Sequence, residues 1–325
     1  MTTGAKHMLP KARSLASMAA ALLIALALLP SASVQSEQAK VQTFDSPKAA
    51  AAALIGAARA KDRERVLAIL GADAGEWIAS SDPVQDAQAR DRFIGAYEEK
   101  NAIEMEGGDE AVLVVGEDGF PFPIPIVKQA SGWAFDAEQG REEILDRRIG
   151  QNELSTIQVL LAIVDAQLDY ATRDWDGNGL RAYAARFRSS EGKQDGLYWP
   201  TGEGEAPSPL GPLVAQAASE GYIPDPAGSE GEASPAYHGY RFRLLTGQGE
   251  NAPGGAYDYA VNGELIGGFA TIAFPTKYGN SGVMTFMVSH DGAVYETDLG
   301  PETTTQALAI ETFDPSPQWK KSETN

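Results

Sequence analysis

The residues best suited to chemistry in this sequence are oxygen ligands in the segment Asp174-Trp175-Asp176-Gly177-Asn178-Gly179. Asp174, Asp176 and Asn178 stand at alternate positions, and glycine supplies the turn, which is the pattern of the first half of a calcium loop. The second half is missing, because Ala185 stands where such a loop places its bidentate glutamate. The sequence therefore predicts a calcium site of low affinity at these three residues. The alternative is an Asx-type turn that ends a helix.

Nucleophilic catalysis would depend on histidine, and His238 and His290 are the only histidines after residue 33. The segment Gly279-Asn280-Ser281-Gly282 lacks the second glycine of a nucleophile elbow. A site that combines Ser281 or Ser289 with His290 has no motif behind it, so we interpret these residues as the end of a hairpin. The sequence also has no phosphate-binding loop and no dinucleotide fingerprint. We therefore predict no catalytic residues, and no cofactor apart from calcium.

The charge balance excludes several classes of partner. The chain holds 26 Lys and Arg residues against 45 Asp and Glu residues. Without residues 1–33, which contain three bases and no acid, 23 bases remain against 45 acids, a formal charge of −22. Nucleic acid and anionic lipid surfaces repel such a chain, so we expect neither as a partner. The absence of cysteine excludes disulfides, thiol catalysis and cysteine-ligated zinc.

Residues 1–33 have the order of a secretory signal peptide. Basic residues up to Arg13 precede an apolar run from Leu15 to Leu29, and small residues follow, so cleavage is expected after Ser33 or Ser36. The run is shorter than the roughly 20 residues of a membrane span, although an uncleaved anchor is the alternative. We therefore expect a periplasmic or extracellular protein with no stable membrane span once the signal is removed.

Residues 44–138 are predicted to form an α+β domain. Helix-start signals at Ser46-Pro47, Asp62 and Asp82-Pro83 predict helices over 48–60, over 62–70 and from 83 onward. Strand patterns separated by turn residues cover 102–106, 111–115, 120–127 and 133–135.

The third of these strands contains Pro121, Pro123 and Pro125 at every second position. Prolines with this period remove the N–H donors from one side only, which predicts an edge strand over 120–127. A polyproline-like loop is the alternative.

The order of elements and the phrase Gly132-Trp133-Ala134-Phe135-Asp136 resemble the ketosteroid-isomerase-like cone, in which helices pack on a curved antiparallel sheet. Enzymes of that fold carry an Asp, His or Tyr set inside the cone. The segment 44–138 contains no histidine, so a cone used for binding or packing is the preferred interpretation.

Residues 140–313 are predicted to form a second α+β domain, a long helix packed on an antiparallel sheet. A charged lead-in over 140–149 is expected to break near Gly150. The main apolar stripe of the helix is Leu154, Ile157, Leu161, Val164, Leu168 and Ala171, and a second row is Leu160, Ile163 and Tyr170.

Strand patterns follow in this second domain over 240–244, 269–274, 283–288 and 294–297. Residues 189–237 are predicted to be a long surface excursion that contains an aromatic cluster at 196–200 and a short helix at 212–221. The polar tail 314–325 is expected to fray.

Four phrases resemble an uncharacterised family of exported bacterial proteins, domain of unknown function 2950, which implies no activity. They are Phe122-Pro123-Ile124-Pro125, Gly140-Arg141-Glu142-Glu143-Ile144-Leu145, Asp195-Gly196-Leu197-Tyr198-Trp199-Pro200 and Ala252-Pro253-Gly254-Gly255-Ala256-Tyr257-Asp258-Tyr259.

From Asn152 onward the chain also resembles the globular half of a type IV pilin or pseudopilin. The phrases Ile163-Val164-Asp165-Ala166-Gln167 and Gly282-Val283-Met284-Thr285-Phe286 carry this likeness. It implies a pilin-like helix on a sheet, used here away from a filament, because residues 140–149 are charged and follow a soluble domain.

Two functions are consistent with these observations. The preferred one is an exported, non-enzymatic binding or assembly module of the cell envelope, whose partner is an envelope protein or a small ligand. The alternative is an envelope hydrolase or isomerase with a site in the N-terminal cone. A deep cone pocket with a buried acid would favour the enzyme.

Overall fold

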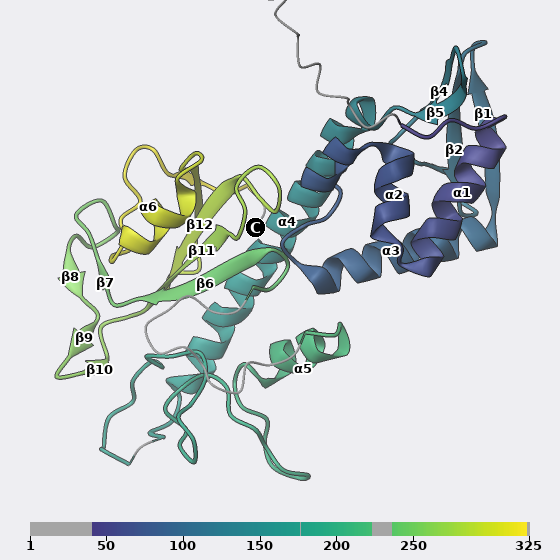
Figure 1. The fold of residues 1–325 in the computed structure, drawn as a ribbon. Coiled ribbons are helices and arrows are strands. Elements are labelled where there is room, and N and C mark those ends of the chain that lie inside the picture. Colours follow the sequence, from purple (N-terminus) through teal and green to yellow (C-terminus); the bar gives the residue numbers. More distant parts are fainter. Residues whose placement is uncertain (1–40, 176, 223–235, 324–325) are drawn as a thin grey trace, which may run out of the picture. The chain divides into compact units, whose positions relative to one another are not determined.

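The computed structural model describes residues 41–175, 177–222 and 236–323. In these residues six α-helices combine with several antiparallel sheets, so the α+β fold class is confirmed (Figure 1). The predicted signal peptide and Asp176 lie outside the described residues. Among the helices that are described, none has both the length and the apolar character needed to cross a membrane.

Polar caps fix where the first helices begin. These helices are α1 (Pro47–Ala60), α2 (Arg63–Leu70) and α3 (Pro83–Glu99), and a short 3-10 helix, η1 (Ala72–Glu76), lies between α2 and α3. Each α-helix follows a capping residue, Ser46, Asp62 or Asp82, whose side-chain oxygen accepts an N–H of the first turn. These N–H groups have no partner inside the helix, which is why the cap stabilises the start that the sequence predicts.

The first sheet follows directly and packs against α1 and α2. Its strands are β1 (Asn101–Glu106), β2 (Glu110–Val115), β3 (Phe120–Pro121), β4 (Ile126–Gln129) and β5 (Gly132–Phe135). Their order is β1-β2-β4-β5, with β3 paired to β2. Leu54, Ile69 and Leu113 are among the buried side chains that join the helices to the sheet.

The prediction of one edge strand over 120–127 is wrong. Residues 122–125 lie outside the ladder, and β4 is an inner strand because Ile126 pairs with Ala111 on one side and with Phe135 on the other. Pro123 and Pro125 have no N–H to donate, so the ladder stops where they stand and resumes after them.

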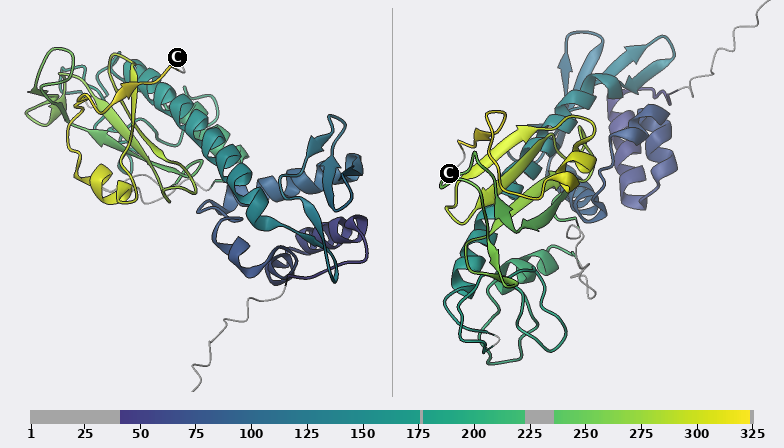
Figure 2. Two further views of the ribbon diagram at one scale, coloured as in Figure 1. Left: turned by 90° about the horizontal axis from the view of Figure 1, so that it is seen from above. Right: turned by 90° about the vertical axis from the view of Figure 1, so that its left-hand side faces the viewer.

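The helix α4 (Ala137–Tyr170) runs without a break through 34 residues, which corrects the expected interruption near Gly150 (Figure 2). An isolated glycine costs a helix only about 1 kcal/mol, and packing on both sides of Gly150 outweighs that cost. Towards its start, Ile144 and Leu145 pack on the first core. Near its middle, Glu153 Oε1 accepts the N–H groups of Val283 and Met284 at 3.0 and 2.9 Å.

The buried face of α4 is rotated from the predicted main stripe. In the main stripe Ile157 and Val164 are buried, but Leu154 and Leu168 are 51% and 46% exposed. Leu160 and Ile163 of the second row are also buried. Asn152, Thr156 and Gln167 are buried beside them, and polar residues of this kind do not count in a hydrophobic stripe. The apolar pattern therefore predicted the helix correctly, but the buried face is rotated about the helix axis towards the second row.

The second sheet contains β6 (Tyr240–Leu245), β11 (Ala270–Pro275), β12 (Met284–Ser289), β13 (Val294–Asp298) and β14 (Lys320–Lys321), in the antiparallel order β14-β13-β12-β11-β6. Short pairs are formed by β7 (Gly247–Gln248) with β8 (Tyr257–Asp258), and by β9 (Ala260–Val261) with β10 (Glu264–Leu265). One face of the sheet packs on α4, and the unpredicted helix α6 (Thr303–Ala309) covers the other (Figure 1).

Two segments expected at the surface contribute to this second core. In the excursion, which includes α5 (Gly211–Ser219), Leu197 and Trp199 are buried against α4 and the sheet. In the tail, Trp319 is buried and β14 pairs with β13 instead of fraying. Gly, Pro and Ser content predicted a loop in the excursion, and polarity predicted fraying in the tail, but segments with a few large aromatic residues can still close a core.

Candidate binding pocket

The predicted calcium ligands lie in a tight turn after α4. Asp174 Oδ1 accepts the N–H of Gly177 at 2.8 Å, and its Oδ2 accepts the N–H of Gly179 at 2.9 Å. Asn178 Oδ1 accepts the N–H of Leu180 at 2.8 Å, and Asp176 lies outside the described residues. These bonds are those of an Asx-type turn. Calcium binding at Asp174, Asp176 and Asn178 stays a prediction.

The serines considered for catalysis bond to their own turns. Ser281 Oγ accepts the N–H of Lys277 at 3.0 Å, and Ser289 Oγ donates to Asp291 Oδ1 at 2.8 Å. His290 Nδ1 is buried and has no hydrogen-bond partner among the described residues. These contacts are those of turn residues, and the absence of catalytic residues stays a prediction.

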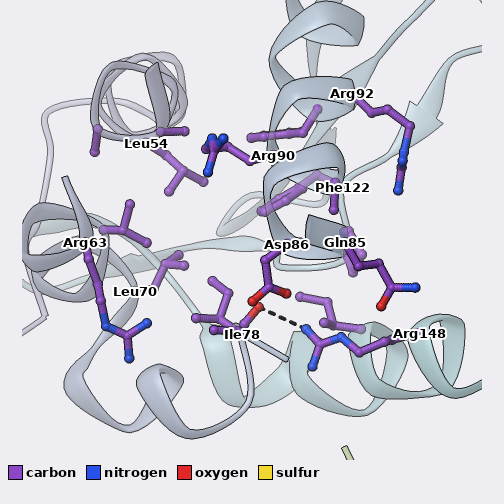
Figure 3. A pocket seen from close by; sticks show the side chains of 18 of the residues that line it. Leu54, Arg63, Leu70, Ile78, Gln85, Asp86, Arg90, Arg92, Phe122 and Arg148 are labelled. Atoms are coloured by element: carbon purple, nitrogen blue, oxygen red, sulfur yellow. Dashed lines mark hydrogen bonds between the residues drawn. The ribbon is translucent and has the colours of Figure 1, made fainter. Parts of the chain in front are cut away.

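A hollow of about 530 Å³ lies beside the first core, and it is the candidate site. Its walls come from α1, α2, α3, the proline segment 122–123 and the first half of α4. Leu54, Leu70 and Phe122 supply apolar surface (Figure 3). This volume is within the range of small-molecule sites and about three times that of a cavity that holds benzene.

Helix α3 forms a wall of this pocket and contacts the first core through partly buried side chains. None of its 17 residues is fully buried. Its first turn is instead held by Asp82, which is 2% exposed. Asp82 Oδ1 accepts the N–H groups of Val84 and Gln85, and Oδ2 accepts the hydroxyl of Tyr222 at 2.7 Å and the N–H of Gly239 at 3.2 Å. Four bonds to one carboxylate therefore fix the start of α3, while Phe93, Ala96 and Tyr97 pack its second half on the first core.

One end of the pocket carries Arg148 of α4. Its Nη1 donates to the carbonyl of Trp77 at 2.9 Å and to Asn280 Oδ1 at 3.2 Å, and its Nη2 donates to the carbonyl of Ile78 at 2.9 Å. Asp86 of α3 points toward the same end (Figure 3). Burial lowers the pKa of the Arg148 guanidinium, and the charge of Asp86 partly opposes that shift.

The chain matches the profile of a family described as a protein of unknown function, DUF2950, over residues 41–322. The match covers most of the chain. The protein belongs to the DUF2950 family. Searches of curated proteins and of solved structures gave no match.

In this DUF2950 protein a second polar cluster lies next to the Asp82 anchor. His238 Nε2 is 3.3 Å from Glu220 Oε2, and the hydroxyl of Tyr237 donates to the same oxygen at 3.1 Å. Burial lowers the pKa of His238, while the charges of Glu220 and Asp82 oppose this shift. Burial also raises the pKa of the hydroxyls of Tyr222 and Tyr237 above their usual range. The cluster holds the chain near Gly239, to which Asp82 is bonded.

Sequence reasoning did not identify the pocket of the DUF2950 protein. Its lining residues come from four helices and the segments between them, from Leu54 to Asn152, and no motif links them. The sequence does contain a signal for a basic site, since an acidic chain carries two closely spaced pairs of arginines, Arg90 with Arg92 and Arg147 with Arg148. By their charge alone, residues 140–149 predict only a lead-in to the long helix.

Proposed function

We propose that this protein is an exported binding module of the cell envelope, and that the pocket beside α3 takes a small molecule with an apolar body. The observation that carries the proposal is a hollow of about 530 Å³ beside the first core, whose lining includes Leu54, Leu70 and Phe122. Each Å² of apolar surface that a ligand removes from water contributes about 25 cal/mol of favourable binding free energy.

Export rests on the sequence of residues 1–33, with its basic start, apolar run and small residues. We also propose that the helix α4 on its antiparallel sheet is a pilin-like scaffold used away from a filament. An envelope protein remains a second kind of partner, and calcium at Asp174, Asp176 and Asn178 remains part of the proposal.

Binding is favoured over catalysis by the state of the two acids in the pocket. Asp62 Oδ1 accepts the N–H of Arg65 at 3.0 Å as a helix cap. Both oxygens of Asp86 accept the N–H of Ser80, at 2.9 and 3.0 Å. A general base must reach a substrate proton, and carboxylates committed to the backbone are poorly placed for it. No histidine is among the described residues that line the pocket. The alternative of an envelope hydrolase or isomerase is therefore the less favoured proposal.

The test is the binding of an uncharged fluorescent naphthylamine dye to the mature protein. Ala89 lines the pocket from an exposed position of α3, so Ala89→Trp should fill the hollow with little effect on folding. Ala52 is exposed on α1 and does not line the pocket, so Ala52→Trp is the matched control.

We expect dye fluorescence to rise on wild-type protein and on Ala52→Trp, and to stay near background on Ala89→Trp. No dye binding to wild-type protein, or equal binding to both variants, would refute the proposed pocket. Circular dichroism of both variants verifies that they are folded.

A further inference from the structure

The pocket is lined by more bases than acids, whereas the whole chain has more acids than bases. Six basic residues line it, Lys61, Arg63, Arg90, Arg92, Arg147 and Arg148, against two acids, Asp62 and Asp86. The whole chain holds 26 bases and 45 acids. Screening limits charge interactions in solution to about 8 Å at physiological salt, so a ligand inside the pocket responds to these local bases more than to distant acids. The lining of the pocket is therefore basic although the chain as a whole is acidic.

Several guanidinium groups keep donors that no protein group uses. Arg148 has five N–H donors, and three of them bond to neutral oxygens; the other two have no partner among the described residues. Arg63 donates once, from Nη2 to the carbonyl of Gly75 at 3.2 Å. Arg90 pairs with the exposed Asp91 beside it in the sequence, and it extends from α3 toward Leu54 of α1 (Figure 3). Arginines of three helices thus present donors at one hollow.

Two of the arginines are paired with acids outside the pocket, Arg147 with Glu143 at 2.5 Å and Arg90 with Asp91 at 3.1 Å. The two acids that line the pocket do not contact Arg63 or Arg148 as ion-pair partners. The oxygens of Asp86 are occupied by the N–H of Ser80, and Asp62 caps α2. Among the described ion pairs, Arg148 has no carboxylate within 4.0 Å. A half-buried guanidinium without a contacting counter-ion is a strong donor for an incoming anion, because charge-assisted bonds are about twice as strong as neutral ones.

The apolar part of the lining requires that the ligand also has an apolar part. Leu54, Leu70, Ile78, Phe93 and Phe122 line the same hollow and offer no donor to an anion. We propose that the ligand of this pocket is an anionic amphiphile, with a carboxylate or phosphate head held by arginines of α2, α3 and α4 and an alkyl or fused-ring body on the apolar wall.

This inference rests on the proposed binding function and deepens it. A small free anion would leave the apolar wall in water, and an uncharged lipid would leave the spare arginine donors without a partner. A cationic amphiphile would face the like charges of Arg63 and Arg148, which have no carboxylate within 4.0 Å among the described ion pairs.

The experiment measures displacement of the uncharged naphthylamine dye by four ten-carbon probes: decanoate, decyl phosphate, decanol and decyltrimethylammonium, each below its micelle concentration. We expect the better anion to displace the dye at a concentration about tenfold or more below that of decanol, which corresponds to one charge-assisted bond. The ammonium probe should be the weakest. The order of decanoate and decyl phosphate identifies the head group.

The arginine contribution is tested with Arg63→Gln. Arg63 is exposed, so folding should be unaffected, and the anion preference over decanol should fall severalfold. Arg65→Gln is the matched control, since Arg65 is exposed on the same helix and does not line the pocket. The half-buried Arg148 is tested as Arg148→Lys, which keeps the charge but loses the planar fork.

The outcomes separate the two proposals. Equal displacement by decanol and both anions overturns the anionic head while the pocket stands. Failure of the dye itself to bind overturns the pocket and the amphiphile together. A preference for anions that survives both arginine variants also overturns the assignment of the head group to these arginines.

Discussion

Helix α3 and strand β11 are opposite extremes of packing in one chain. All six residues of β11 are buried, with α4 on one face of its sheet and α6 on the other. None of the 17 residues of α3 is fully buried, and the helix is held at its start by the bonds of Asp82. A filled core of the β11 kind resists change but has no room for a ligand. The incompletely packed side of α3 has both room and unpaired donors.

The two halves of α4 have different roles, one in the pocket and one in the second core. Its second half closes the core around β11, and its first half presents Arg147 and Arg148 to the pocket. Substitutions in the first half of α4 should therefore alter ligand binding, and substitutions in its second half should alter the free energy of unfolding.

The largest expected effect is on the filled core. Leu160→Ala removes a fully buried side chain of α4 and leaves a cavity, which should cost about 2–5 kcal/mol of unfolding free energy. Leu168→Ala changes a side chain that is 46% exposed and should cost less than about 1 kcal/mol. Urea denaturation of the full chain measures both. Equal losses would show that the helix does not face the sheet as described.

The next largest effect on stability is expected at Gly140, where α4 contacts residues 123–124. A Cβ added at Gly140 would lie 2.7 Å from Ile124 Cγ1 and 2.8 Å from the carbonyl oxygen of Pro123, so Gly140→Ala should destabilise by about 1–3 kcal/mol. Gly150 has nothing within 4 Å of such an atom. Gly150→Ala should therefore stabilise the unbroken helix by about 0.5–1 kcal/mol. A loss of stability in Gly150→Ala would argue for the break that the sequence predicted.

A smaller effect is expected in the polar cluster next to the Asp82 anchor. Burial lowers the folded-state pKa of His238, so the unfolded chain binds the proton more readily. The stability from neutral His238 is complete above pH 6.5 and is lost as the pH falls from 6.5 through the lowered folded value, at most about 1.4 kcal/mol per pH unit.

His238→Asn should remove this component, since asparagine tolerates the backbone φ of +49° at this position. The measurement is the difference in unfolding free energy between wild type and variant from pH 8 to pH 5. A difference that stays constant with pH, or that favours the wild type at low pH, would contradict the assigned direction of the shift.

The smallest effect is expected at the turn after α4. The predicted ligand set at Asp174, Asp176 and Asn178 is half of a calcium loop, and Asp174 already accepts two backbone N–H groups. Calorimetric titration should show binding of about 10⁻⁴–10⁻³ M or weaker. Micromolar binding would mean that a further ligand completes the site.

Local patterns determined most of the elements of this protein. The starts of α1, α2 and α3 follow from Ser46, Asp62 and Asp82, because a helix cap is a contact between near neighbours in sequence. Most strands of both sheets and the α+β class follow from alternation and turn residues for the same reason, whereas β14 and the interruption at residues 122–125 do not. Composition alone excluded thiol chemistry and disulfides.

The tertiary structure decided what depends on neighbours distant in sequence. Which side of α4 is buried depends on the sheet that covers it, so Leu168 is exposed and Asn152 is buried despite the apolar pattern. The pocket depends on side chains from four helices, and its arginines are a binding feature only because those helices place them around one hollow. Hydrophobic periodicity records the preference of each residue, whereas a cavity is a property of how the elements fit together.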